Sequence, residues 1–229
     1  EGQSPHAFEP SPKQLSRLAE AEMLLTMGLP FEQQLLRRIG PLYPELQMVE
    51  TDQGIALRTL PHFHHGERCM HGHGASDPHI WLGPSNAVAI ARNICNALQQ
   101  ADPDRADAYE ENMARLAGRL EDLDRELRRK LAPHAGRRFY VFHPSFGYFA
   151  DAYGLEQIPV EIDGKAPSPR QLASLIEQAR KDGVRTIFVQ EQFPAESAEA
   201  IAEAIGGNVA RLDPLASDVV GNLRRIADA

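Results

Sequence analysis

Short apolar runs alternate with helix-like segments over residues 137–229, and this alternation constrains the fold more than any other feature. The apolar runs lie at 139–142, 157–160, 184–189 and 208–212, and helical periodicity follows them at 146–153, 168–181, 195–205 and 217–227. Short buried strands separated by helices are typical of a parallel sheet with right-handed crossovers and helices on both faces. The sequence therefore predicts an α/β lobe over this half of the chain.

The first part of the chain shows the same alternation in a shorter form. A helix is predicted over about 12–22, capped by Ser11 or Ser4, and is followed by a strand at 23–27, a helix at 31–39 and a strand near 46–49. A further helix is predicted at 85–99. Because no strand precedes the first helix, we expect the first lobe to be truncated at its N-terminus.

The longest helical pattern covers about 104–131 and divides the two halves. Its apolar residues recur three or four positions apart: Ala106, Tyr109, Met113, Leu116, Leu120, Leu123, Leu127 and Leu131. Such a helix would be about 42 Å long, enough to brace two lobes; the other reading is a coiled-coil segment for dimerisation. We predict an N-terminal α/β lobe at 1–103, a linking helix at 104–132 and a C-terminal α/β lobe at 133–229, in a monomeric protein.

Charge and composition exclude several classes of function. A formal charge of −8 and a pI near 5.6 argue against nucleic acid as a partner and fit a cation better. No apolar run approaches the length of about 20 residues that spans a membrane. The two cysteines form neither a disulfide framework nor a zinc finger. Cys95 lies on an apolar helical face, whereas Cys69 could bind metal or pair with Cys95.

Histidines are concentrated in residues 62–83, which hold six of the nine in the chain. Five of them have no apolar periodicity around them and predict a mobile loop able to bind metal, or simply a solvated tract: His62, His64, His65, His71 and His73. His79 differs, because Asp77-Pro78 precedes it and Ile80-Trp81-Leu82 follows it. A rigid turn and an apolar anchor would hold its ring as a defined ligand needs, or as a core histidine.

Two further metal-competent side chains come directly after predicted strands. His143 and Asp213 each precede a proline, and ligands of open parallel sheets bind outside the carboxyl ends of the strands. His6 lies in a similar loop next to Pro5. With His79 these residues would make a tetrahedral site of three imidazoles and one carboxylate, suited to zinc. Each taken alone could instead be a histidine bonded to backbone or an ordinary turn residue.

Five stretches carry a resemblance to a known family. They are SPHAFEPSPKQL (4–15), SDPHIWLGP (76–84), FHPSFGYFADAYGL (142–155), APSPRQLASLIEQARKDGVRTIFV (166–189) and NVARLDPLA (208–216). Together they resemble the metal-binding solute-binding proteins of bacterial ABC uptake systems (cluster A-I, zinc-uptake branch), over nearly the whole chain. One motif departs from the family: Val-Gln-Glu-Gln-Phe stands at 189–193 in place of Val-Glu-Pro-Gln-Phe, so no role transfers to Gln190 or Glu191.

The resemblance implies both a fold and a function. It implies two Rossmann-like lobes joined by one long helix, with zinc held in the cleft between them by His6, His79, His143 and Asp213, and it implies that residues 62–73 are the His-rich loop of zinc-specific members. Such a protein is periplasmic or lipid-anchored outside the cytoplasm, although no signal segment is present in this chain, and it delivers zinc with high affinity to a membrane ABC permease.

Two alternatives stay open at this point. Manganese-binding members carry a glutamate in place of the third histidine, so His143 favours zinc over a manganese-binding or adhesion-type relative. A zinc hydrolase would need an open coordination position and a carboxylate base such as Glu9 or Glu191. The chain has no His-Glu-x-x-His helix and no nucleophile elbow, which argues against an enzyme.

Overall fold

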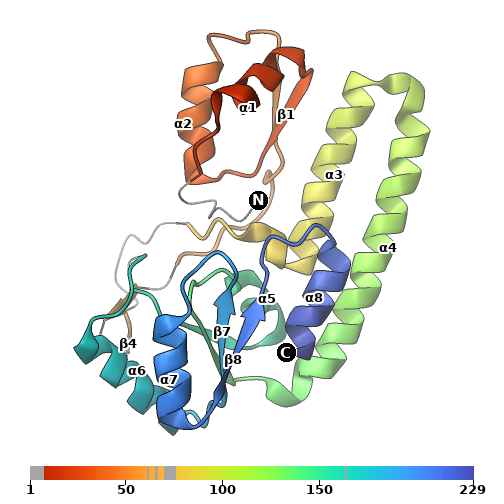
Figure 1. The fold of residues 1–229 in the computed structure, drawn as a ribbon. Coiled ribbons are helices and arrows are strands. Elements are labelled where there is room, and N and C mark those ends of the chain that lie inside the picture. Colours follow the sequence, from red (N-terminus) through yellow and green to blue (C-terminus); the bar gives the residue numbers. More distant parts are fainter. Residues whose placement is uncertain (1–7, 61, 65–66, 70–75, 163) are drawn as a thin grey trace. The chain divides into compact units, whose positions relative to one another are not determined.

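The computed structural model describes residues 8–60, 62–64, 67–69, 76–162 and 164–229 (Figure 1). The α-helices are α1 (Pro12–Ser16), α2 (Pro30–Ile39), α3 (Pro84–Ala101), α4 (Ala106–Leu131), α5 (Gly147–Tyr153), α6 (Pro169–Lys181), α7 (Glu196–Ile205) and α8 (Val219–Asp228). The strands are β1 (Met23–Thr26), β2 (Gln47–Glu50), β3 (His62–His64), β4 (Glu67–Cys69), β5 (Arg138–Val141), β6 (Glu156–Pro159), β7 (Thr186–Gln190) and β8 (Asn208–Leu212). Short 3-10 turns are η2 (Arg17–Glu20), η3 (Ile80–Leu82), η4 (Pro103–Arg105) and η5 (Ala132–His134). None of the helices in these described ranges is long and apolar enough to cross a membrane.

The chain forms two compact units that are interleaved in sequence. The first comprises Glu1–Ala56 and Pro84–Asp122, and the second comprises Leu57–Gly83 and Leu123–Ala229. Helix α4 contributes residues to both units. The segment that contains His79 therefore belongs to the same unit as His143 and Asp213. The prediction of an α/β protein with two lobes, parallel sheets and one long helix is confirmed, whereas the boundaries at 103 and 132 stay a prediction.

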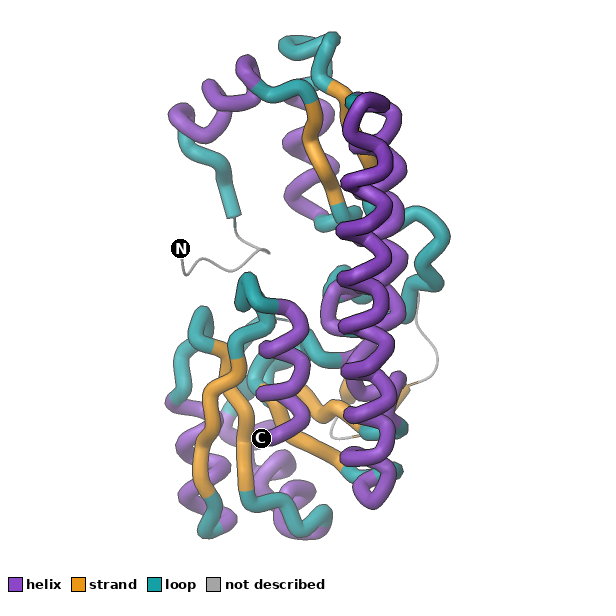
Figure 2. Tube along the Cα trace, turned by 90° about the vertical axis from the view of Figure 1, so that its right-hand side faces the viewer, coloured by secondary structure: helices purple, strands orange, loops and turns teal. Residues whose placement is uncertain are grey.

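A four-stranded parallel sheet in the order β6-β5-β7-β8 organises the second unit (Figure 2). Helices α6 and α7 pack on one face, where Leu175 and Ile201 join a core that includes Tyr140, Ile187 and Val189. The chain moves from β5 to β6 on one side and then to β7 on the other. The strand order thus reverses beside β5, and parallel α/β sheets bind ligands at the carboxyl ends of strands at such a point.

Local sequence signals explain where the helices of this unit begin and end. Helix α6 starts with a capping box in which Ser168 and Gln171 satisfy each other's backbone N–H groups, with Pro169 in the first turn. Helix α5 ends at Gly154, which adopts a left-handed conformation with φ 67°. The predicted helices are therefore found within one or two residues of their expected ends.

The first unit contains a smaller parallel sheet of β1 and β2, connected by α2. Ser11, one of the two predicted caps, caps α1 through a capping box with Gln14. The predicted helix over 12–22 is shorter than expected, because α1 ends at Ser16 and continues as the 3-10 turn η2. The Ser16 hydroxyl donates to the Lys13 carbonyl at 2.9 Å, a local bond that competes with the regular helical pattern.

The apolar stripe of α4 is buried, as its periodicity predicts. Met113, Leu120, Leu123, Leu127 and Leu131 are each at most 7% exposed. The 26 residues of α4 correspond to about 39 Å at 1.5 Å per residue. Opposite charges lie on its exposed face, where Glu126 forms an ion pair with Arg224 at 2.8 Å.

Part of the His-rich segment pairs as a hairpin instead of forming an irregular loop. The backbones of β3 and β4 run antiparallel, with His62 opposite Cys69 and His64 opposite Glu67. The expectation was wrong for these six residues, because composition carries no information on backbone pairing between neighbouring segments. His65, His71 and His73 lie outside the described residues, as do all side chains of 61–75. Cys95 is buried, and it forms no disulfide among the described side chains.

Candidate metal site

His79 is held by the Asp-Pro-His turn that the sequence singled out. Its side chain is 5% exposed, and Ile80 and Leu82 of the following turn η3 are also buried. Oδ1 of Asp77 accepts from both the backbone N–H of His79 at 3.0 Å and its ring Nδ1 at 2.7 Å. A carboxylate that accepts from Nδ1 fixes the tautomer in which Nε2 carries a lone pair. The turn therefore presents Nε2 of His79 as a metal-binding atom.

Burial and hydrogen bonding set the charge states in this turn. Burial lowers the pKa of His79 below its ordinary value of 6.5, although the neighbouring Asp77 carboxylate opposes the change. Burial alone would raise the pKa of Asp77, but hydrogen bonds from His79 and from Arg58 hold that pKa below its usual range. The pair is thus a neutral imidazole beside an ionised carboxylate, the state in which histidine binds a metal.

His143 lies just beyond the carboxyl end of β5, beside the reversal of strand order. Gln190, fully buried at the end of β7, accepts from the His143 backbone N–H at 3.1 Å and donates to its carbonyl at 2.5 Å. The ring stacks on Phe193 with 4.8 Å between centroids. Its Nδ1 lies 2.7 Å from Oε1 of Glu161, whose side chain is 6% exposed. His143 is therefore oriented in the same way as His79, with a buried carboxylate behind Nδ1.

The structure brings the two predicted histidines together. Their Nε2 atoms are 3.2 Å apart, and their rings meet edge to face with 5.1 Å between centroids. Two ligands of a tetrahedral zinc ion, each about 2.0–2.1 Å from the metal, lie about 3.3 Å from each other. The separation of the two nitrogen atoms matches one edge of such a tetrahedron.

Asp213 lies on the loop after β8, which is tied to the His79 segment. Trp81 Nε1, two residues beyond His79, donates to the carbonyl of Pro214 at 2.7 Å. The Asp213 carboxylate accepts from the backbone N–H of Leu215 at 2.9 Å. Gln192 donates to the same oxygen at 3.4 Å. The turn thus holds Asp213 through a local bond typical of an Asp-Pro sequence.

Among the residues that the structure describes, no three His, Cys, Asp or Glu side chains are grouped so that they could hold a metal ion. His6 lies outside the described residues. The assignment of His6, His79, His143 and Asp213 as one ligand set therefore stays a prediction, and only His79 and His143 of the set are seen side by side.

Several residues around the histidines were not singled out from the sequence. Glu161 had a usable signal, since it follows the apolar run at 157–160 and so lies at a strand end like His143. Asp77 was read only as part of a turn. Gln190 and Arg58 carry no sequence signal for their roles, because each meets its partner across a long separation along the chain.

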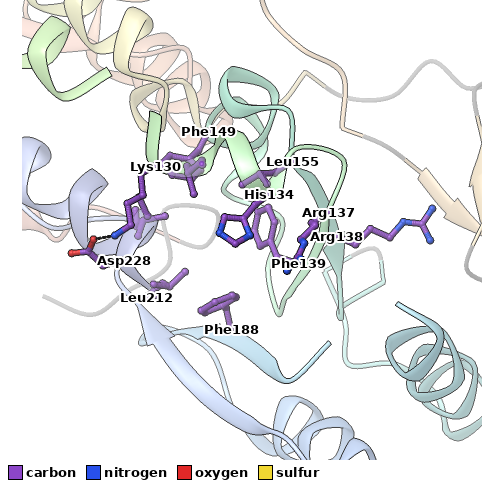
Figure 3. A pocket seen from close by; sticks show the side chains of 14 residues that line it. Lys130, His134, Arg137, Arg138, Phe139, Phe149, Leu155, Phe188, Leu212 and Asp228 are labelled. Atoms are coloured by element: carbon purple, nitrogen blue, oxygen red, sulfur yellow. Dashed lines mark hydrogen bonds and ion pairs between the residues drawn. The ribbon is translucent and has the colours of Figure 1, made fainter. Parts of the chain in front are cut away.

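A separate cavity of about 330 Å³ lies in the second unit between the sheet and the helices on its other face (Figure 3). Phe139, Phe149 and Phe188 give it apolar walls, and Lys130 and His134 lie among its polar residues. His79, His143 and Asp213, the predicted zinc ligands that the structure describes, are not among the residues that line it. His134 is exposed, which makes it a histidine of the same unit outside the candidate site.

Comparison with known proteins gives a consistent result over the length of the chain. Residues 1–224 match the family described as zinc-uptake complex component A, periplasmic (ZnuA). The high-affinity zinc uptake system protein ZnuA of Paracoccus denitrificans is 30% identical over 93% of this chain and 74% of its own length. The zinc-binding protein AdcA of Streptococcus pyogenes is 28% identical over 93% of this chain, which spans only 44% of AdcA.

Solved structures agree with the sequence match. A crystal structure of ZnuA superimposes with a TM-score of 0.90 and 39% identity, covering 99% of this chain and 84% of that one. A 138–173 deletion mutant of ZnuA with zinc bound superimposes with a TM-score of 0.88 and 40% identity, with the same coverage. The chain belongs to the periplasmic zinc-uptake component A (ZnuA) family of solute-binding proteins.

Proposed function

We propose that this chain is a zinc carrier that binds one zinc ion through His6, His79, His143 and Asp213 and delivers it to a membrane ABC permease. Membership of the zinc-uptake family supports the cargo and the partner. The same membership supports a location in the periplasm or at the outer face of the cell membrane. The protein carries out no chemistry on its cargo, and it acts as a monomer.

The observation that carries the proposal is the way the two histidines face each other. Asp77 and Glu161 can each accept a hydrogen bond from Nδ1 of one ring, and in the tautomers that make these two bonds the lone pairs of the Nε2 atoms face each other at a separation of 3.2 Å. Two lone pairs at this distance repel each other, and a cation bound to both removes the repulsion. Imidazole nitrogens are favoured ligands of zinc and poor ligands of manganese, which favours zinc as that cation.

Four protein ligands would leave zinc without an open position for water. A closed coordination shell suits binding and transfer, whereas a zinc hydrolase needs a bound water and a nearby general base. Among the residues that the structure describes, the carboxylates bonded to the two histidines are Asp77 and Glu161, and both are engaged with Nδ1 atoms and are unavailable as that base. Release of zinc would then come from small movements of ligand loops, such as the one that carries Asp213.

The test is a competition titration of metal-stripped protein with zinc and manganese, against a chromophoric chelator. We expect one tight zinc site per chain and weaker manganese binding. His143→Ala should abolish the tight site, whereas His134→Ala, a matched change at an exposed histidine of the same unit, should leave it intact.

Two results would overturn the proposal. Zinc binding that is equally tight in the His143→Ala and His134→Ala proteins would leave the segment 62–73 as the only ligand. Manganese binding tighter than zinc binding would make the chain a manganese-binding relative. Histidines of the segment 62–73 are expected to add a second, weaker class of zinc sites, which appears as a separate phase of the same titration.

A further inference from the structure

Arg58 is bound to the same carboxylate that orients His79. Its Nη1 donates to Oδ2 of Asp77 at 2.8 Å, while Oδ1 of Asp77 accepts from His79 Nδ1 at 2.7 Å. The side chain of Arg58 is 15% exposed and that of Asp77 is fully buried. Arginine stays protonated at any physiological pH. A permanent positive charge therefore lies one carboxylate away from a proposed zinc ligand.

The position of Asp77 does not depend on the guanidinium group alone. The Asp77 backbone N–H donates to the Arg58 carbonyl at 2.8 Å, and the Asp77 carbonyl accepts from the Tyr148 hydroxyl at 3.0 Å. The same hydroxyl accepts from the Arg58 backbone N–H at 3.1 Å. These backbone bonds hold the Arg58 and Asp77 segments together, so the distinct contribution of the Arg58 side chain is its charge.

A second carboxylate partly offsets that charge. Asp151 accepts from Nε of Arg58 at 2.8 Å and is 61% exposed. The other proposed histidine has no comparable arrangement: within the described ranges, Glu161 pairs with His143 and with no arginine or lysine. The carboxylate behind His79 is thus shared with a cation, whereas the carboxylate behind His143 is not.

We infer that Arg58 limits the zinc affinity of the site by drawing the charge of Asp77 away from His79. This inference rests on the proposed function. A carboxylate behind a histidine raises its basicity toward the metal, and the partners of ligands change metal affinity by about 10–100-fold. A cation on that carboxylate opposes the effect and also repels the doubly charged cargo. A carrier that must hand its zinc on benefits from such a limit, because a bound ion that is held too tightly is released too slowly.

The direction of the change in zinc affinity distinguishes an effect of the Arg58 charge from a structural role of its side chain. Arg58→Gln keeps a polar side chain with N–H donors and removes the charge. We expect its zinc dissociation constant to fall about tenfold, with a slower release rate in stopped-flow chelator experiments. A purely structural role for Arg58 predicts the opposite, a looser site with faster release.

Asp151→Asn is the complementary variant, because it leaves the guanidinium charge less compensated. We expect it to weaken zinc binding about threefold, roughly half of a tenfold effect on a logarithmic scale, since Asp151 is largely exposed and solvent screens its charge. Arg224→Gln is the matched control, since Arg224 forms an exposed ion pair with Glu126 in the same unit. It should bind zinc like the unchanged protein.

Weaker or unchanged binding in Arg58→Gln overturns the inference. If that variant does not fold, Asp151→Asn decides, and unchanged or tighter zinc binding in it overturns the inference as well. Failure of the proposed function looks different. In that case the unchanged protein lacks a tight zinc site, or His143→Ala leaves the site intact.

Discussion

Gly147 occupies a position that no larger residue can take without displacing Arg58 from Asp77. A Cβ atom there would lie 1.7 Å from Nη1 of Arg58 and 2.7 Å from Oδ2 of Asp77. Both distances are far below van der Waals contact. Gly147→Ala therefore forces the guanidinium away from Asp77, because the carboxylate is fully buried and the arginine side chain is the more flexible partner.

The size of the effect follows from the interaction that is lost. A hydrogen bond to a charged group contributes about 1.5–3 kcal/mol to the free energy of unfolding, and Asp77 keeps its other donors. Alanine gains about 0.5–1 kcal/mol over glycine in the middle of a helix, and less at Gly147, which is the first residue of α5. The expected net loss is about 1–2 kcal/mol, which lowers the melting temperature of the metal-free protein by about 2–8 °C for a chain of this size.

Gly118→Ala is the matched control, because Gly118 lies inside α4 and a Cβ atom there would meet nothing within 4 Å. This change should raise the melting temperature slightly, since alanine is the better helix former by about 1 kcal/mol. The assay is thermal unfolding of both variants after metal removal, followed by circular dichroism. Equal shifts in the two proteins, or a stabilised Gly147→Ala protein, would refute the argument that Arg58 and Asp77 fill this space.

Three further predictions concern the histidines and the metal. Glu161→Gln should weaken zinc binding about 10–100-fold in chelator competition, because His143 loses the carboxylate on Nδ1; binding within twofold of the original would contradict this. The folded state keeps His79 neutral, since burial lowers its pKa below 6.5, whereas the unfolded chain takes up a proton there. The free energy of unfolding of the metal-free protein should therefore decrease as pH falls through 6.5, with a smaller slope in His79→Gln, and the His79 ring resonances should titrate below pH 6.5 in NMR spectra. Zinc at 100 times its dissociation constant should stabilise the protein by about 2.7 kcal/mol, and a chelator should remove this gain completely, as calorimetry can measure.

Much of the fold could be predicted because its signals are local. The apolar run at 208–212 coincides with β8, and the stripe of α4 is buried at Met113, Leu120 and Leu127. Periodicity and capping residues act within a few positions of the chain, so these signals can be identified from the sequence alone. The hairpin of β3 and β4 could not be predicted from composition, since its stability depends on pairing between two backbones.

The candidate site was predictable in part for the same reason. His79 and His143 were found because a proline-fixed turn and a strand end are local features, and the structure places their Nε2 atoms 3.2 Å apart. The hydrogen bonds of Gln190 to the His143 backbone could not be predicted, because the two residues are 47 positions apart along the chain. Asp213 was found by the same local signals as His143, and its membership of the site stays a prediction.

The sequence by itself determined the order of strands and helices, the type of metal that the candidate ligands prefer, and the proline-fixed positions of the candidate histidines His6, His79 and His143. Only the tertiary structure decided that Asp77 is shared between His79 and Arg58 and that Glu161 supports His143. The physical reason is distance: propensity, capping and side-chain chemistry act between near neighbours in the chain. Hydrogen bonds between buried side chains depend on which strands and turns the folded chain brings together.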